Sequence, residues 1–162
     1  MVQQEPKRTR RKTNYKGAAQ KKTSGLLPRT PKQKEFIDAL KDFTQIFVLG
    51  PAGTGKTYVT ATIAADLYTT KEVDKIVITR PHVAVGKELG FLKGDLTEKT
   101  MPWALPVLDV LEKHLGKGAV ETAIKNGNIE MAPLALMRGR SFDDAFIIVD
   151  ETQNITTHEL KM

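Results

Sequence analysis

Eight consecutive residues carry the most specific chemistry in the chain, and they have the spacing G-x-x-x-x-G-K-T. They are Gly50, Pro51, Ala52, Gly53, Thr54, Gly55, Lys56 and Thr57. Glycines in such a loop let successive backbone N–H groups point inward at a polyphosphate. The lysine ammonium then faces the β- and γ-phosphates, and the hydroxyl of the next residue is a ligand for Mg²⁺. The spacing therefore predicts a phosphate-binding loop in which Lys56 and Thr57 contact the phosphates and the metal.

Two acids, Asp150 and Glu151, end a continuous apolar run at residues 145–149. Ligands in open α/β sheets bind at the carboxyl ends of strands, so both carboxylates fall where a nucleotide would lie. We expect Asp150 to hold Mg²⁺, mostly through water, and Glu151 to orient and polarise the water that attacks the γ-phosphate. The alternative is a surface Asp-Glu pair at a strand end, which the complete phosphate loop in the same chain argues against.

The tandem acids also discriminate between reaction classes. A kinase positions an acceptor molecule and does not need a water-activating glutamate beside the metal-binding aspartate, whereas a nucleotide hydrolase does. The pair therefore favours hydrolysis over phosphoryl transfer.

Alternating strand and helix patterns predict the elements that position these residues. Strands are expected at residues 45–49, 75–79, 129–132 and 145–149. Helices are expected to begin at Thr30, at Thr57, near Leu105 and at Ala119. The alternation predicts an α/β fold with a parallel sheet covered by helices on both faces. Residues 80–102 form a long, glycine-containing connection of the kind that usually carries function.

The composition excludes several classes of protein. The chain has 162 residues, 40% of them hydrophobic, which suffices for one domain with a packed core. No apolar run approaches the ~18 residues that cross a bilayer, and the basic N-terminal segment lacks the apolar stretch of a secretory signal, so we expect no membrane partner. With no cysteine there is neither a disulfide framework nor a thiolate metal site, in keeping with a cytoplasmic location.

Positive charge is concentrated near the N-terminus. Residues 1–30 hold nine lysines and arginines against one acid, a net charge of +8, whereas the rest of the chain carries −2. Few large apolar side chains occur in residues 1–29, so we expect a disordered basic tail there and an ordered domain over residues 30–162. Such a tail binds the phosphates of a nucleic acid or remains a solvated extension, and its composition leaves both open.

Four blocks of sequence together resemble a known family. They are TPKQKEFIDAL at residues 30–40, the phosphate loop, ITRPHVAVGKELGFLKGDLTEK at 78–99 and IEMAPLALMRGRSFDDAFIIVDETQN at 129–154. In this order they look like the PhoH-like family of phosphate-starvation-inducible P-loop ATPases, from about residue 30 to the last residue. The resemblance implies a RecA-like fold related to the core of superfamily-one helicases, Mg·ATP hydrolysis, and a role in the metabolism of RNA or another single-stranded nucleic acid. It also implies ring-like homo-oligomers with sites shared between subunits.

The resemblance assigns roles to two glutamines. Gln33 matches the upstream glutamine that in related helicases hydrogen-bonds the adenine edge. The alternative for Gln33 is a capping box with Thr30, and one side chain is not expected to do both jobs. Gln153 matches the glutamine that senses the γ-phosphate, with helix capping after the strand as its alternative.

Three arginines fall within the matching blocks: Arg80, Arg138 and Arg140. Guanidinium groups suit phosphate recognition, so these residues are candidates for contact with a nucleic acid strand or a neighbouring subunit. Salt bridges to Asp143, Asp144 or other acids are the alternative. Trp103 is expected to pack in the core rather than to stack on a base, and the three histidines show no ligand spacing.

The sequence stops at Met162, inside what should be a helix after the two acids, whereas members of the family continue. In RecA-like sheets the strand after the acidic strand lies between it and the phosphate-loop strand. We therefore expect an incomplete sheet with two unpaired inner edges. Nucleotide binding with little turnover is expected, because an arginine finger contributes ~10³-fold or more to the rate. Two other functions stay open: a nucleotide-dependent RNA-binding module without hydrolysis, and a fragment without activity of its own.

Overall fold

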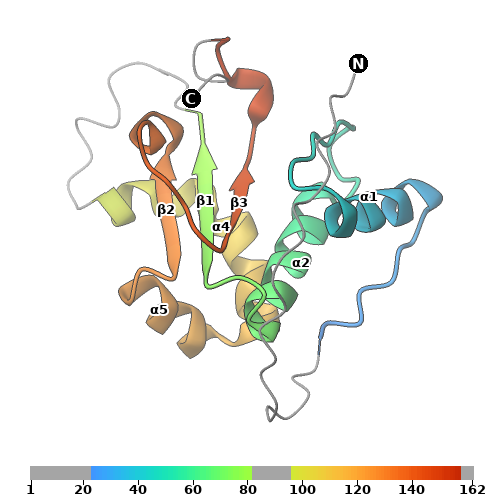
Figure 1. Ribbon diagram of the computed structural model, residues 1–162, viewed down its shortest axis with the longest axis horizontal. Helices are drawn as coiled ribbons and strands as arrows, with labels where there is room; N and C mark the ends of the chain where they lie inside the picture. Colours follow the sequence, from blue (N-terminus) through green and yellow to red (C-terminus); the bar gives the residue numbers. More distant parts are fainter. Residues whose placement is uncertain (1–22, 82–95, 158–162) are drawn as a thin grey trace.

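Helices and parallel strands alternate along the chain in the computed structural model, which describes residues 23–81 and 96–157 (Figure 1). The elements are α1 (Pro31–Asp42), α2 (Lys56–Thr70), β1 (Lys75–Arg80), α4 (Leu96–Leu115), α5 (Lys117–Lys125), β2 (Ile129–Pro133), the 3-10 turn η1 (Leu134–Met137), β3 (Ala145–Val149) and the 3-10 turn η2 (Thr152–Asn154). None of the helices in the described ranges combines the length and hydropathy needed to span a membrane.

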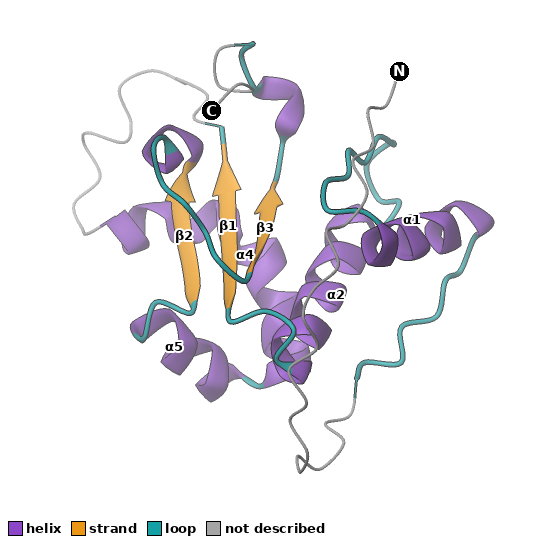
Figure 2. Cartoon of the chain, viewed as in Figure 1, coloured by secondary structure: helices purple, strands orange, loops and turns teal. Residues whose placement is uncertain are grey.

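The three strands form one parallel sheet in the order β2-β1-β3. In the central strand, Ile78 lies opposite Met131 of β2 and Ile148 of β3. All three strands run in the same direction, so their carboxyl ends meet at one edge of the sheet (Figure 2). A parallel sheet flanked by helices confirms the predicted α/β fold class and agrees with a P-loop NTPase architecture.

The main core lies on one face of this sheet. Ile76 and Ile78 of β1 are completely buried there, beneath α2, α4 and α5. The helical residues that fill this layer are Ala61, Ala64 and Ala65 of α2, Ala104, Val107, Leu108 and Leu111 of α4, and Val120 and Ala123 of α5. Three small alanines on α2 allow the helix to pack closely against the strands, which fixes where its N-terminus lies.

The opposite face is covered by the connection from β2 to β3, which crosses the front of the sheet in Figure 2. Residues of this connection and of the strands line a cavity of about 200 Å³: Thr79, Leu134, Met137, Arg140, Phe142, Ile147 and Val149. Side chains of β3 alternate, so that Ile148 is buried while Ile147 and Val149 are 45% and 37% exposed. Within residues 23–81 and 96–157, this face carries the connection from β2 to β3 in place of an α-helix, and the acidic strand is partly exposed, so for these residues the expectations of helices on both faces and of a fully buried acidic strand are not met.

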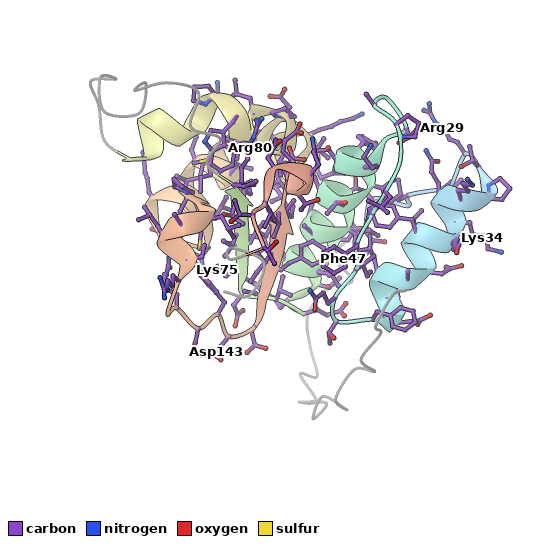
Figure 3. The ribbon with its side chains drawn as sticks, turned by 90° about the horizontal axis from the view of Figure 1, so that it is seen from above. Arg29, Lys34, Phe47, Lys75, Arg80 and Asp143 are labelled. Atoms are coloured by element: carbon purple, nitrogen blue, oxygen red, sulfur yellow. The ribbon has the colours of Figure 1, made fainter. Side chains whose placement is uncertain are left out.

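The predicted strand at residues 45–49 is also wrong. The segment before the phosphate loop forms no strand, and its Phe47 and Leu49 are 54% and 93% exposed. In Figure 3 Phe47 lies between β3 and α1. A strand needs a neighbour to satisfy its backbone groups, and among the described residues β3 pairs with β1 alone, on one side. This agrees with the expectation that the phosphate-loop segment and the acidic strand would not pair.

Two element boundaries differ from the sequence prediction. Helix α4 begins at Leu96, well before Leu105, although it contains Pro102 and Pro106. Packing of its second half against α2 and the sheet holds the helix together despite the lost backbone donors. The remainder of the predicted long connection, residues 82–95, lies outside the described residues. Among the described residues, tertiary contacts already involve Ser24, which lies six residues before Thr30 and donates hydrogen bonds to Asp66.

Candidate functional site

The phosphate loop joins an extended segment to α2 through two glycines in the left-handed region. Gly53 and Gly55 have φ of 76° and 83°, a conformation that costs other L-residues ~1–2 kcal/mol. Gly55 immediately precedes α2, and no side chain caps the first turn of that helix. The N-terminal N–H groups of a 15-residue helix therefore face the loop without a side-chain acceptor, which is the arrangement that binds anions.

Lys56 folds back over this loop. Its ammonium donates hydrogen bonds to the carbonyl oxygens of Gly50 (2.7 Å) and Pro51 (2.8 Å), and the Thr54 hydroxyl donates to the same Pro51 oxygen (2.9 Å). These partners are neutral dipoles, so the positive charge of Lys56 is held in the loop without being cancelled. The loop thus combines an uncapped helix end with a half-buried cation, and its residues fit a polyphosphate.

The two acids follow β3 directly. The backbone N–H of Asp150 donates to the carbonyl of Thr79 (2.9 Å), which continues the β1–β3 ladder past the last residue of the strand. Glu151 then adopts φ 53° and ψ 40°, a left-handed conformation that is uncommon for a residue with a side chain. Its carboxylate accepts a hydrogen bond from the amide nitrogen of Gln153. Backbone strain of this kind concentrates at functional sites, and here it falls on the predicted water-activating acid.

The phosphate loop and the acids lie at the same end of the molecule, toward which the strands run (Figure 1). The hydroxyl of Thr57 and the carboxylate of Asp150 are oxygen donors of the kind that Mg²⁺ prefers, so they fit the predicted metal. Within the part of the chain that the structure describes, no hydrogen bond or ion pair joins the loop to Asp150 or Glu151. The structure therefore places both halves at the end of the molecule toward which the strands run, with no hydrogen bond or ion pair between them among the described residues.

Gln33 contacts the phosphate loop, which sequence reasoning did not foresee. Its backbone N–H donates to the Thr30 hydroxyl (3.1 Å), so the helix cap uses no side-chain atom of Gln33. The side-chain oxygen accepts from the backbone N–H of Arg29 (2.8 Å), and the side-chain nitrogen donates to the carbonyl of Thr54 (3.1 Å). The reciprocal half of the capping box is thus made to Arg29 in place of Thr30. One lone pair and one N–H of the amide remain for another partner.

Of the three candidate arginines, Arg140 forms a salt bridge. Its guanidinium binds both carboxylate oxygens of Glu130, at 3.0 Å for the Nη2–Oε2 pair, and the ammonium of Lys75 lies 2.7 Å from Oε2. The Arg140 guanidinium, more than any other group, lowers the pKa of Glu130 to about 2. The salt-bridge alternative therefore holds for Arg140, with Glu130 in place of the aspartates.

The other two arginines differ from Arg140 in their surroundings. Arg138 is exposed after η1, and Arg80 is half-buried at the carboxyl end of β1, the edge that Figure 3 views from above. Trp103 packs against the main core, as predicted. His114 lies 3.3 Å from the Thr62 hydroxyl, and His82 and His158 lie outside the described residues.

Comparison with known proteins identifies the family of the chain. The family model described as PhoH-like protein matches residues 25–162. The chain is 45% identical over 137 residues to the PhoH-like protein of Mycobacterium tuberculosis (strain ATCC 25618 / H37Rv) and 44% identical over 141 residues to that of Bacillus subtilis (strain 168). It is 42% identical over 142 residues to Protein PhoH of Escherichia coli (strain K12). These matches cover 85–87% of this chain and 39–44% of the relatives, so the chain spans about two fifths of their length.

Because of the Glu130 salt bridge, the free energy of unfolding should decrease when the pH is lowered into the acid range. We expect Glu130→Gln to lower the free energy of unfolding at pH 7 by ~1–2 kcal/mol, because the amide loses its charge-assisted hydrogen bonds. The pKa of Glu130 in the folded protein is about 2, below its ordinary value of 4.5. The carboxylate therefore stabilises the fold fully above pH 4.5, and this contribution disappears as the pH falls toward 2.

Denaturant unfolding of both proteins between pH 7 and 2 measures this difference. Glu121→Gln, at an exposed position of α5, is the matched control and should leave the curve unchanged. A gap between Glu130→Gln and the unmodified chain that stays constant down to pH 2 would contradict the assignment.

Proposed function

The chain belongs to the PhoH-like protein family, and from this premise we propose that it binds Mg·ATP at the phosphate loop and hydrolyses it. The observation that carries the proposal is the loop itself: two left-handed glycines, an uncapped α2 and the ammonium of Lys56 held among loop carbonyls. The chain spans about two fifths of the length of its relatives. ATP hydrolysis as an activity of the whole protein therefore belongs to this proposal.

Binding begins with an exchange of partners at Lys56. The ammonium leaves the neutral carbonyls of Gly50 and Pro51 for the β- and γ-phosphates, whose negative charge attracts it more strongly. Backbone N–H groups of the loop and of the first turn of α2 hold the remaining phosphate oxygens. One remaining N–H and one lone pair of the Gln33 amide are suited to the adenine edge, which supports ATP as the nucleotide.

Hydrolysis depends on the acids after β3. Thr57 and Asp150 would hold Mg²⁺, which neutralises charge that develops on the phosphate oxygens. Glu151 orients the attacking water and accepts its proton, and for this it must turn from the Gln153 amide toward the water. Gln153, released from Glu151, is then placed to sense the γ-phosphate.

We extend the proposal to a nucleic-acid partner. The net charge of +8 in residues 1–30 supports attraction to phosphate backbones, and the exposed Arg138 and the strand-end Arg80 are the arginines suited to contact them. Arg140 is less suited, because Glu130 already neutralises its charge. RNA or another single-stranded nucleic acid, assembly with further copies of the chain and a cytoplasmic location belong to this wider proposal.

Nucleotide affinity tests the role of the loop. We expect Lys56→Ala to weaken Mg·ATP binding at least ~10-fold, since a charge-assisted contact with phosphate is lost. Lys71→Ala is the matched control, because Lys71 is an exposed lysine just beyond the other end of α2, and it should bind as the unmodified chain does. Isothermal titration of Mg·ATP into the three proteins measures the difference. Equal affinities for all three would refute the assignment.

Substitution of Glu151 tests hydrolysis separately from nucleotide binding. We expect Glu151→Gln to retain Mg·ATP affinity while phosphate release slows ~10²-fold or more, because the amide cannot accept a proton from water. Single-turnover assays of phosphate release at saturating Mg·ATP check this. A hydrolysis rate equal to that of the unmodified chain would exclude Glu151 as the base. Absence of hydrolysis in the unmodified chain, with binding intact, would favour the nucleotide-dependent binding module instead.

A further inference from the structure

Residues 23–30, here called the strap, connect the N-terminal segment to α1 and are fastened to α2. The backbone N–H and the hydroxyl of Ser24 donate to the two carboxylate oxygens of Asp66, at 2.7 and 2.6 Å. Leu26 packs into a small apolar cluster formed by Ile37, Val59 and Ile63. Charge-assisted hydrogen bonds and apolar contacts thus anchor the strap on the second half of α2.

The other end of the strap reaches the phosphate loop through one side chain. Arg29 donates its backbone N–H to the oxygen of the Gln33 amide, and the nitrogen of that amide donates to the carbonyl of Thr54. Figure 3 shows Arg29 beside the loop that leads into α2. Because the same side-chain amide makes both hydrogen bonds, a displacement of Arg29 changes the geometry with which Gln33 donates to Thr54.

The hydrogen bond from Gln33 acts on the peptide unit that joins Thr54 to Gly55 in the phosphate loop. The carbonyl of Thr54 and the N–H of Gly55 belong to one trans peptide unit, so they point in opposite directions. Drawing the Thr54 oxygen toward Gln33 therefore turns the Gly55 N–H away from Gln33. Gly55 is left-handed, and a Cβ built on it would lie 3.4 Å from the Gln33 nitrogen, so the amide packs directly against this peptide.

We propose that Gln33 is a positioning residue that couples the strap to the phosphate loop, so that anchorage of the strap at Asp66 sets the affinity of the loop for nucleotide. Asp66 lies ten residues beyond Lys56, about 15 Å along the helix, and so contacts no nucleotide held in the loop. The effect on affinity rests on the proposed ATP site. The effect on the shape of the loop does not require it.

Two substitutions test the two steps of this coupling separately: the anchorage at Asp66 and the contact of Gln33 with Thr54. Ser24→Ala removes one of the two hydrogen bonds to Asp66 and leaves the loop residues intact. Gln33→Glu keeps an acceptor for the Arg29 N–H and removes the donor to Thr54. Thr70→Ala is the control, because it removes a hydroxyl that bonds the backbone of Asp66 and Leu67 without touching the strap.

Amide hydrogen exchange of residues 53–56 in the nucleotide-free protein is the first measurement, and Mg·ATP affinity by titration is the second. Ser24→Ala should speed exchange in the loop and weaken Mg·ATP about fivefold. In the Gln33→Glu background, Ser24→Ala should change neither quantity, since the link that carries its effect is already broken. Ser24→Thr, which keeps the hydroxyl donor, and Thr70→Ala should behave as the unmodified chain.

Unchanged loop exchange in Ser24→Ala, or equal effects of this substitution with and without Gln33, would overturn the coupling. If Ser24→Ala fails to fold, Leu26→Ala tests the same anchorage in the same two backgrounds, with the same expected pattern. If the unmodified chain binds no Mg·ATP, the proposed function fails, and the exchange measurement still decides whether the strap controls the loop.

Discussion

The parallel pairing of β1 with β3 is the constraint on which the candidate site depends. It carries the acidic residues to the sheet edge at which α2 begins, and the bond from the Asp150 N–H to the Thr79 carbonyl fixes the point at which the ladder ends. Directly afterwards Glu151 turns into the left-handed region, where the ladder no longer constrains the chain. The buried central strand and the small residues of α2 make this geometry rigid, so the chemistry-bearing side chains project from fixed backbone positions.

Charged groups in this molecule are held in two different ways. Lys56 and Glu151 have neutral partners, namely two loop carbonyls and the Gln153 amide. Arg140 is instead neutralised by Glu130, whose pKa of about 2 keeps the pair ionised. A charge on a neutral dipole is easily attracted away by a phosphate or a polarised water, whereas separating an ion pair leaves an unpaired charge. The first arrangement suits catalysis and the second suits the packing of the sheet face.

Local sequence patterns predicted the elements whose signals are local. The loop spacing, the helix that follows it and the β-branched runs at 75–79 and 145–149 each specify their own conformation. The segment at 45–49 has an equally apolar pattern, but a strand also needs a neighbour, which no local pattern supplies. The start of α4 was missed for a related reason, because Pro102 and Pro106 oppose a helix that tertiary packing sustains.

In the candidate site too, features with a local sequence signal were predicted, and features that depend on tertiary neighbours were not. Sequence spacing singled out Lys56 and the two acids as candidates, because their proposed roles follow from a motif. Two sets of contacts join residues from separate elements: Gln33 with Thr54, and Glu130 with Lys75 and Arg140. No spacing in the sequence predicts either set. Opposite charges near the ends of adjacent strands were the only available signal for that network.

Paramagnetic Mn²⁺ in place of Mg²⁺ tests most directly whether the loop and the acids serve one nucleotide. With ATP bound, backbone amide signals within reach of the metal broaden in NMR spectra. The account predicts that signals of residues 53–57 and of Asp150 and Glu151 broaden together, and that in Lys56→Ala both groups need a higher Mn·ATP concentration to broaden to the same extent. Broadening confined to the loop, with sharp signals from both acids at saturating Mn·ATP, would contradict it.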